Sequence, residues 1–285
     1  MDPARVLLVL HRPSSAENLG AVARVMKNFG LTRLLVVEPP AWSGRPRSGR
    51  GGPAREDVLS RARVTARRAG DVLSRVELSP DLASALASAT WACGTTSRAV
   101  EGRAALSPRQ LAAEAARRSR RGPVAVVLGE ERRGLSDAEL ELCQAVCTIP
   151  TDAGYDSMNL AQAAAVLCYE LHLAAGRGVS PERGRPVARE AARRRPTAAP
   201  EKALRGRPGE ARRGEPVRRA TAEALWERLR ALLAAAGYLN PQNPDHILAE
   251  WRRLLDRAEP TQREVELLLA AARALERALR LRRSQ

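Results

Sequence analysis

The sequence predicts an α/β domain built on a parallel sheet, followed by a basic linker and a small all-α C-terminal domain. Three observations predict this organisation. Short apolar runs alternate with helical patterns up to about residue 175, a stretch rich in arginine and proline follows, and residues 218–285 carry only helical patterns. Alternation of strands and helices is typical of βαβ units, in which helices cover the faces of a parallel sheet.

The first βαβ unit opens the chain. The apolar run Arg5–Leu10 predicts a buried strand, and Leu34–Val37 predicts its neighbour. Between them, Asn18–Phe29 has apolar residues at i, i+3, i+4 and i+7, which is the spacing of one helix face. Gly30 follows this pattern and is expected to cap the helix, because glycine adopts the left-handed conformation of a helix end at low cost.

The alternation continues through the N-terminal domain. Further strands are expected at Thr90–Cys93, Val124–Leu128 and Val146–Ile149. Further helices are expected at Pro80–Ser88, Ser107–Ser119, Ser136–Gln144 and Asn159–Ala174. Ser136 and Glu139 have the spacing of a capping box, which satisfies two backbone amides at a helix start. The segment Trp42–Arg55 is rich in glycine, arginine and proline and predicts a mobile loop.

A basic stretch separates the two domains. Between Arg177 and Arg219, fourteen Lys and Arg residues face five Glu, so this stretch contributes +9 to a net charge of +16. Large apolar residues are few, so no core can form, and we expect a disordered linker over 176–217 between domains 1–175 and 218–285. A field this positive attracts polyanions, and nucleic acid is the commonest one. The alternative is that an arginine-rich proteome raises the charge without any such partner.

Three helices are expected in the C-terminal domain. They cover Thr221–Ala236, Pro244 to about Arg257 with Asn243 as N-cap, and Thr261 to about Arg283 with Thr261 and Glu264 as a capping box. The first helix is expected to stop at Gly237. Its apolar stripe, which includes Leu225 and Leu229, needs a partner surface. Either a small helical bundle or a contact between two copies of the chain would supply it.

Composition argues against several other classes of protein. No apolar run approaches the roughly 18–20 residues that cross a bilayer, and no signal-peptide pattern opens the chain, so we expect a soluble, cytoplasmic protein without membrane contact. The four cysteines have neither zinc-site pairing nor the density of a disulfide framework. Cys143 and Cys147 are spaced to share one helix face, but buried reduced thiols are the better interpretation. No metal site is expected.

The first segment with chemical potential runs from Asn18 to Arg24. Gly20 and Arg24 are four residues apart and share a helix face, and helical side chains lean toward the N-terminus. This spacing would place the Arg24 guanidinium over the bare surface of Gly20 at a helix start, ready for a phosphate or a hydroxyl. The plainer alternative is that Asn18 is an N-cap and Arg24 is a solvated side chain.

Two more segments lie where strands are expected to end. The loop Leu128–Leu135 (LGEERRGL) follows a strand and precedes a capped helix, and it matches neither a phosphate-binding P-loop nor a dinucleotide fingerprint. The segment Ile149–Ala163 leads from a strand through a polar loop into a regular helix, with Ser157 or Asn159 as the natural N-cap. Ligands bind outside the carboxyl ends of strands in open parallel sheets. Taken singly, each segment is also explained as a tight connection or a helix cap.

Taken together and in this order, the three segments resemble the SPOUT superfamily of RNA methyltransferases. The likeness is greatest to the TrmJ-like branch of its 2′-O-methyltransferases, in the TrmH/SpoU family, and it covers most of residues 4–175. The motifs that carry it are Asn18-x-Gly20-x-x-x-Arg24, Gly129-x-Glu131-x-x-Gly134-Leu135, and Ile149-Pro150 through Ser157-Met158-Asn159. The segment 234–244 and the helices around it resemble the TrmJ-type C-terminal domain. The linker is longer and more basic than this family leads us to expect.

The resemblance implies a fold, a cofactor and a substrate class. The fold is an α/β domain with a deep trefoil knot, a rare exception to unknotted topology, and S-adenosylmethionine lies bent in the knot. By motif position, the cofactor is held by Thr95, Thr96, Ser97, Gly129, Ile149, Asp156, Ser157 and Met158. The family implies a homodimer with an RNA site across the interface. The implied substrate is tRNA, with cytidine or uridine at anticodon-loop position 32 as the target.

The resemblance also implies catalytic residues. Arg24 is the family's counterpart for catalysis, with Asn18, Glu131, Ser157 and Asn159 positioning it and the ribose. Because arginine is always protonated in proteins, stabilising a developing alkoxide or orienting the ribose through a phosphate is easier to defend than a role as base. Met158 stands where leucine is common, a swap that conserves volume.

Other functions stay open from the sequence. One is 2′-O-methylation of rRNA or of another tRNA site. Another is a knotted RNA-binding protein without catalysis, which the intact motif residues oppose. A nucleotide-dependent oxidoreductase fits worse, because no Gly-x-Gly-x-x-Gly follows a strand.

Overall fold

The computed structural model describes residues 1–38, 55–100, 105–152, 154, 157–176, 214–239 and 244–283. Almost all of the expected loop 42–55 and of the expected linker 176–217 lies outside these residues, as does Asp156. The two predicted domain boundaries therefore stay predictions.

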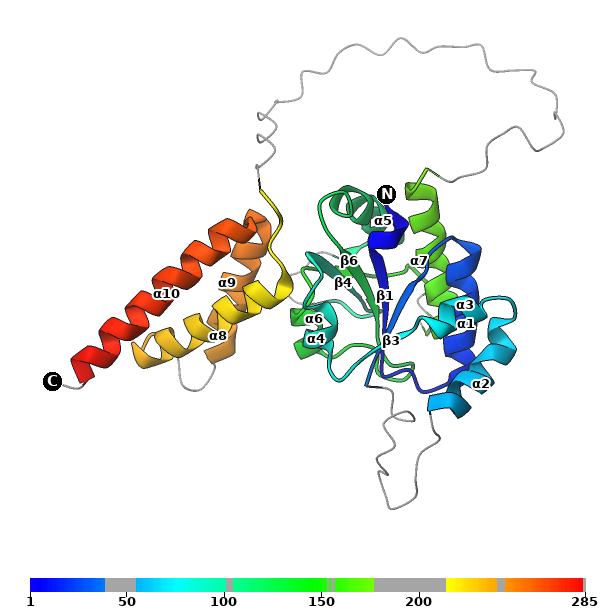
Figure 1. The fold of residues 1–285 in the computed structure, drawn as a ribbon, viewed down its shortest axis with the longest axis horizontal. Coiled ribbons are helices and arrows are strands. Elements are labelled where there is room, and N and C mark those ends of the chain that lie inside the picture. The colour runs from blue at the N-terminus through cyan, green and yellow to red at the C-terminus, as the bar shows by residue number, and fades with distance from the viewer. Residues whose placement is uncertain are drawn as a thin grey trace, which may run out of the picture.

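Within the described residues, seven strands form one sheet (Figure 1). They are β1 Val6–His11, β2 Arg33–Val37, β3 Glu77–Ser79, β4 Trp91–Thr95, β5 Ala105–Leu106, β6 Val124–Leu128 and β7 Ala145–Cys147. Their order across the sheet is β3-β2-β1-β6-β4-β7-β5, and every strand pair is parallel. The carboxyl ends of all seven strands therefore lie along one edge. The expected α/β class with a parallel sheet is confirmed.

The helices of this domain form two layers around the sheet. After the 3-10 turn Pro3–Arg5, they are α1 Ala16–Asn28, α2 Arg55–Ala66, α3 Gly70–Ser74, α4 Leu82–Leu86, α5 Pro108–Arg118, α6 Asp137–Glu141 and α7 Leu160–Ala174. Buried residues of α1, α3, α5 and α7 pack on one face of the sheet, and α4 and α6 cover the other. Helix α2 packs against α1.

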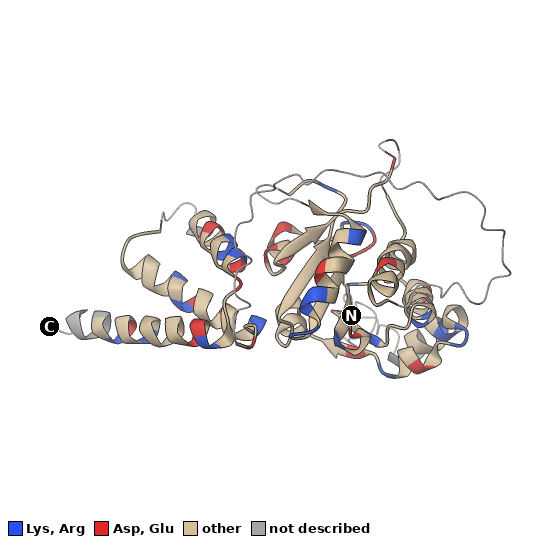
Figure 2. Cartoon of the chain, turned by 90° about the horizontal axis from the view of Figure 1, so that it is seen from above, with Lys and Arg blue, Asp and Glu red and all other residues tan. Residues whose placement is uncertain are grey.

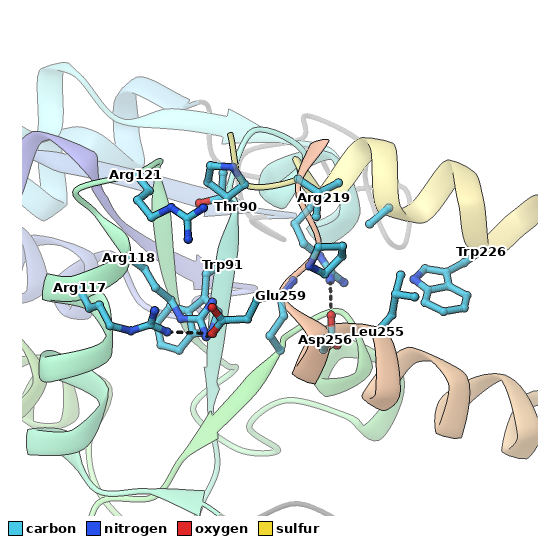
Figure 3. A pocket seen from close by; sticks show the side chains of 15 residues that line it. Thr90, Trp91, Arg117, Arg118, Arg121, Arg219, Trp226, Leu255, Asp256 and Glu259 are labelled. Atoms are coloured by element: carbon cyan, nitrogen blue, oxygen red, sulfur yellow. Dashed lines mark hydrogen bonds and ion pairs between the residues drawn. The ribbon is translucent and has the colours of Figure 1, made fainter. Parts of the chain in front are cut away.

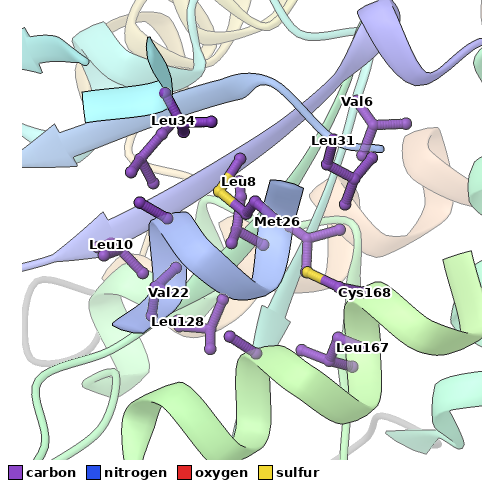
Figure 4. Close-up of a cluster of buried hydrophobic side chains, with 14 of the residues drawn as sticks. Val6, Leu8, Leu10, Val22, Met26, Leu31, Leu34, Leu128, Leu167 and Cys168 are labelled. Carbon is purple, nitrogen blue, oxygen red and sulfur yellow. The ribbon is translucent and has the colours of Figure 1, made fainter. Parts of the chain in front are cut away.

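The core follows the two-residue period of the strands. On β1, Leu8 and Leu10 face the layer that contains α1 and α7, whereas Leu7 and Val9 face α4 and α6. Figure 4 shows the first cluster, in which Met26 of α1 lies among strand side chains. Burying each of these aliphatic side chains contributes roughly 1.5–3 kcal/mol to folding. Because both faces are covered, the strands read as continuous apolar runs, which is why the sequence predicted them.

The structure corrects the expected start of the first helix. Helix α1 begins at Ala16, and the side chain of Ser15 caps it by accepting a hydrogen bond from the Asn18 amide at 3.2 Å. Asn18 is therefore inside the helix rather than its N-cap. Arg24 is the ninth of thirteen helical residues and does not lie at a helix start. At the other end, Gly30 has the expected left-handed backbone, with φ +73°.

The structure also corrects the expectation that Cys143 and Cys147 share one helix face. Cys143 follows helix α6 and Cys147 lies on strand β7, so the two do not share a helix face. All four cysteines are free and buried, as expected. Burial raises the pKa of the Cys147 thiol to about 12, so this side chain stays protonated and is a poor nucleophile at neutral pH.

The C-terminal helices form a bundle. They are α8 Arg219–Ala235, α9 Pro244–Ala258 and α10 Gln262–Arg283. Leu225 of α8 packs with Val265 and Leu269 of α10, so within one chain a bundle partner exists for the α8 stripe. Thr261 and Glu264 form the expected capping interaction, with the Thr261 amide donating to Glu264 Oε2 at 2.7 Å. The predicted N-cap Asn243 lies outside the described residues. Basic and acidic positions are mixed along these helices (Figure 2).

Backbone and ionic contacts join the bundle to the sheet domain. At the start of α8, the Arg219 amide donates to the carbonyl of Ala89 at 3.0 Å. After α9, Glu259 accepts from Arg117 at 2.9 Å and from Arg118 at 2.5 Å, as Figure 3 shows. The Arg118 guanidinium also lies 5.3 Å from the centre of the Trp91 ring. Across the described residues, no helix is both long and apolar enough to span a membrane.

Candidate active site

A cavity of about 320 Å³ opens at the carboxyl ends of β4, β6 and β7, which are neighbours in the sheet. Seven of the residues predicted to hold the cofactor line it: Thr95, Thr96, Ser97, Gly129, Ile149, Ser157 and Met158. The eighth, Asp156, lies outside the described residues. The parallel topology explains this convergence, because segments far apart in the sequence leave the sheet at the same edge.

The loop after β6 is shaped by two glycines. A Cβ on Gly129 would come within 2.3 Å of the carbonyl carbon of Gly134, so no larger residue fits without moving backbone. Gly134 has φ +66°, and its amide donates to the Glu130 carbonyl at 2.8 Å, which closes a tight turn. This turn exposes backbone groups along one wall of the cavity.

Two polar contacts hold the opposite wall. The Thr95 hydroxyl donates to the Val127 carbonyl at 3.0 Å, and the Thr96 amide donates to the Cys147 carbonyl at 3.0 Å. These bonds tie the end of β4 to both neighbouring strands. Arg98 also lines the cavity and pairs with Asp137 of α6 at 2.7 Å.

Helix α7 begins at the floor of the cavity. Asn159 is its N-cap: the side-chain oxygen accepts from the Ala161 amide at 2.8 Å, and Gln162 completes a capping box. Ser157 and Met158, which precede the cap, line the cavity. Of the two N-caps left open by the sequence, the structure selects Asn159.

Three of the predicted catalytic residues form one hydrogen-bond network. Asn18 donates from Nδ2 to Glu131 Oε1 at 2.9 Å, and Asn159 donates from Nδ2 to Asn18 Oδ1 at 3.2 Å. The second oxygen of Glu131 accepts from the Ser14 amide at 2.9 Å. The network connects α1, the loop after β6 and the start of α7. Because Glu131 also lines the cavity, the network borders this cavity.

The Glu131 carboxylate is held in its charged form. Burial alone would raise the pKa of Glu131, but hydrogen bonds from Asn18 and from the Ser14 amide outweigh it, and the pKa lies below its usual value. At neutral pH, Glu131 is therefore an ionised acceptor that orients amide groups. It is not a proton donor.

Arg24 does not join this network within one chain. It is exposed, and it lies six residues beyond Asn18 on α1, about 9 Å along the helix axis. The bare surface of Gly20 is not open to a ligand, because helix α2 fills it: a Cβ there would come within 1.9 Å of the Ala62 carbonyl oxygen. Gly20 thus serves close helix packing, which corrects the expectation that Arg24 leans over an open glycine surface.

Sequence reasoning missed a polar cluster beside the network. His11, at the end of β1, is 3% exposed, and its Nε2 lies 3.5 Å from Glu139 Oε1. Burial lowers the pKa of His11, and its Nδ1 has no hydrogen-bond partner among the described residues. Arg12 and Glu38 follow strands β1 and β2, both with positive φ, and pair at 2.7 Å. These residues belong to no motif or regular spacing, so the sequence did not indicate them. Positive φ at non-glycine residues often marks functional sites.

A smaller cavity, of about 60 Å³, lies between the sheet domain and the bundle and is bordered by the Glu259 ion pairs (Figure 3). Because Arg117 and Arg118 pair with Glu259, and Arg219 pairs with Asp256, this cavity suits a contact between domains better than a substrate site. The strand-end cavity is larger than this one and gathers the predicted residues. In the described part of the chain, no three His, Cys, Asp or Glu side chains gather in a way that would hold a metal ion.

Comparisons with known proteins converge on one group. The model of the SpoU rRNA Methylase family matches residues 5–169, and that of the tRNA methyltransferase TrmJ, C-terminal domain, matches residues 220–284. The tRNA (cytidine/uridine-2′-O-)-methyltransferase TrmJ of Cronobacter sakazakii is 28% identical over 95% of this chain and 96% of its own.

The solved structures that resemble this chain include proteins of the same group. TrmJ from Z. mobilis ZM4 has a TM-score of 0.70 and 25% identity, covering 95% of this chain and 98% of its own. A methylase family protein from Neisseria gonorrhoeae has a TM-score of 0.53 and 34% identity, covering 67% of this chain and 89% of its own.

Proposed function

The chain belongs to the SpoU rRNA methylase family, and from this premise we propose that it transfers a methyl group from S-adenosylmethionine to a ribose 2′-hydroxyl of tRNA. The observation that carries the proposal is the Asn18–Glu131–Asn159 network at the rim of the strand-end cavity. It brings residues of all three motifs to one place.

The strand-end cavity suits the cofactor. Its volume of about 320 Å³ lies within the range of small-molecule sites. Its lining combines apolar side chains such as Leu128 and Ile149 with hydroxyls and with the backbone around Gly129. Such a lining accommodates a purine on one side and polar groups on the other. When bound, S-adenosylmethionine supplies an electrophilic methyl group.

The residues around the cavity have the task of placing the ribose. Methyl transfer is a direct displacement, so orientation of the 2′-oxygen dominates the work of the protein. Glu131, ionised and fixed by two donors, holds the Asn18 amide, which in turn holds the Asn159 amide. Ser157 lines the cavity beside them. We assign these four side chains to positioning the ribose.

Arg24 provides positive charge for the reacting oxygen or a neighbouring phosphate. Its distance from Asn18 on α1 argues that Arg24 does not serve the site of its own chain. A second copy of the chain would bring its Arg24 to that site, in keeping with the homodimer that the resemblance implies. Phe29, which directly follows α1, contacts the half-exposed Tyr169 of α7, and the two rings offer an apolar surface for such a contact.

The substrate is tRNA, with a pyrimidine at anticodon-loop position 32 as the proposed target. The family description names rRNA, but two features favour tRNA: the relatives matched over nearly the whole chain are tRNA enzymes by name, and the C-terminal match is to the TrmJ domain. A trefoil knot around the cofactor, a cytoplasmic location and the domain limits 1–175 and 218–285 complete the proposal.

Mapping of 2′-O-methyl groups in RNA tests this function in cells. A strain without the gene should lose one tRNA 2′-O-methyl group, and the intact gene should restore it. Loss of an rRNA methyl group instead would select the rRNA alternative. No change in any RNA would favour a protein without catalysis.

A further inference from the structure

A surface hollow at the C-terminal half of α1 is surrounded by positive charge. It has a volume of about 300 Å³ and is lined by α1 and by the turn between α2 and α3. Its charged lining residues are Arg24, Lys27, Arg67 and Arg68, all exposed, and no acidic side chain lines it. A concave, purely basic surface attracts an anion.

Only one of these four charges is neutralised within the described residues. Lys27 donates to Asp71 Oδ1 at 2.6 Å and to the Arg68 carbonyl at 2.8 Å, which fastens the α2–α3 turn to α1. The guanidinium groups of Arg24, Arg67 and Arg68 have no ion pair or hydrogen bond in that part of the chain. Lys27 therefore holds the two sides of the hollow together, and the guanidinium groups of the three arginines remain available for a ligand.

The backbone of Arg67 points to an external partner. Arg67 directly follows α2 and has φ +54°, a conformation that disfavours side chains with a Cβ. After α1, α7 and α8, the left-handed residue is a glycine, two positions beyond the helix: Gly30, Gly176 and Gly237. An arginine is retained here although glycine would cost less.

The other non-glycine residues with positive φ have side chains that form ion pairs. Of the four non-glycine residues with positive φ in the described chain, Arg12 and Glu38 pair with each other. Glu259, which follows α9, pairs with Arg117 and Arg118. Each of these three residues therefore combines a left-handed backbone with a side chain that forms an ion pair. Arg67 alone among these four has no partner within the described residues.

We propose that this hollow binds a phosphodiester of the RNA substrate, held by Arg67 and Arg68 together with Arg24. A planar guanidinium group binds a phosphate through two parallel hydrogen bonds. Three guanidinium groups around one hollow provide more N–H donors than a single carboxylate ligand could accept. The hollow contains Arg24, so a phosphate bound here holds the RNA strand beside the residue that we assign to the site of a second copy. The inference rests on the proposed function and adds Arg67 and Arg68 as positioning residues.

Binding of an unmodified tRNA transcript over a range of salt concentrations tests the hollow. The variant R67Q/R68Q should bind roughly tenfold more weakly, and the slope of log affinity against log salt should become shallower by about one, because the loss of one phosphate contact removes about one released ion. The matched variant R75Q/R120Q also removes two exposed arginines that pair with no side chain in the described chain, and it should stay close to wild type. Cofactor affinity should be unchanged in both.

A second variant separates a binding role from a structural one. Arg67→Gly relieves the backbone and should raise Tm by roughly 2–4 °C while it weakens tRNA binding. Wild-type tRNA affinity and slope in R67Q/R68Q, or equal losses in R75Q/R120Q, would overturn the phosphate site and leave the methyltransferase function standing. A wild-type protein that neither binds nor methylates tRNA would instead overturn the proposed function.

Discussion

Asn18 on helix α1 donates from Nδ2 to Oε1 of Glu131 at 2.9 Å, although 113 residues separate them in the sequence. The bond joins the first motif to the second. Asn159 extends it to the third motif through the Asn18 carbonyl oxygen at 3.2 Å. We propose that these three separated segments form one ribose-positioning unit beside a cofactor cavity.

Disrupting this unit should slow the chemical step. Asn18→Ala and Glu131→Gln should each lower the single-turnover methylation rate of tRNA by about a hundredfold, because misplacing a reacting group costs about that much. The double variant should lose little more than either single one, since both remove the same interaction. Glu17→Gln, a neighbour of Asn18 that pairs with the exposed Arg61, is the control and should keep the wild-type rate. Additive losses in the double variant would show that Asn18 and Glu131 act separately.

Gly129 should be essential for cofactor binding. In Gly129→Ala the new Cβ meets backbone atoms of Gly134 and Leu135, so the loop must move away from the cavity. Calorimetry should show loss of S-adenosylmethionine binding, with a folded domain by circular dichroism. Gly70→Ala is the matched control, because a Cβ there meets no atom within 4 Å. Unchanged affinity in Gly129→Ala would remove this loop from the cofactor site.

His11 should make stability depend on acid pH. Burial lowers the pKa of His11 below 6.5, so protonation favours the unfolded chain. The stability that neutral His11 contributes is present above pH 6.5 and is lost as pH falls through its folded pKa. Between pH 7.5 and 5, Tm should therefore fall less in His11→Gln than in wild type, whereas the exposed His246→Gln should keep the wild-type slope. Parallel Tm curves for His11→Gln and wild type would refute this account of His11.

Arg24 should serve the reaction rather than the fold. Arg24→Ala should keep Tm and cofactor affinity, because the side chain is exposed and has no partner in the described chain. Its single-turnover rate should fall by about a hundredfold, the usual effect of losing one electrostatic donor. Arg24→Lys should recover little, since the planar fork is lost. A wild-type rate in Arg24→Ala would make Arg24 an ordinary surface residue.

Mixing two inactive variants tests whether the site is shared between copies. If Arg24 of one chain serves Glu131 of another, then R24A and E131Q chains form a heterodimer with one intact site. After unfolding and refolding together, the mixture should regain about a quarter of wild-type activity, since half of the dimers are mixed and each has one intact site of two. No recovery would place Arg24 and Glu131 in the same site of one chain.

Strand-end positions made much of the site predictable from sequence. Parallel strands end at one edge, so the Thr95–Ser97 segment, Gly129 and the Ser157–Met158 segment were expected to converge, and they line one cavity. Boundaries were harder. The run from Ser14 to Asn18 offers several N-caps, and only packing selects Ser15, which moves Arg24 from the expected helix start to its interior.

Short or weakly patterned elements could not be predicted. Strands β3 and β5 have three and two residues, too few to show a period. Helix α2 is mostly polar, and the Ala62 carbonyl and the Thr65 hydroxyl fit against the bare backbone of Gly20 on α1. The strained positions of Arg12 and Glu38 carry side chains that pair across two strand ends, and no spacing rule signals these positions or that of Arg67.

The most direct test of the central claim is methyl transfer in a defined mixture. Purified protein, S-adenosylmethionine with a labelled methyl group and an unmodified tRNA transcript are incubated, and the RNA is digested and mapped by mass spectrometry. We predict one labelled 2′-O-methylpyrimidine at position 32 of the anticodon loop, and its absence when Glu131 is replaced by Gln. A label on a base, or no label on tRNA with protein that binds the cofactor, would contradict the account.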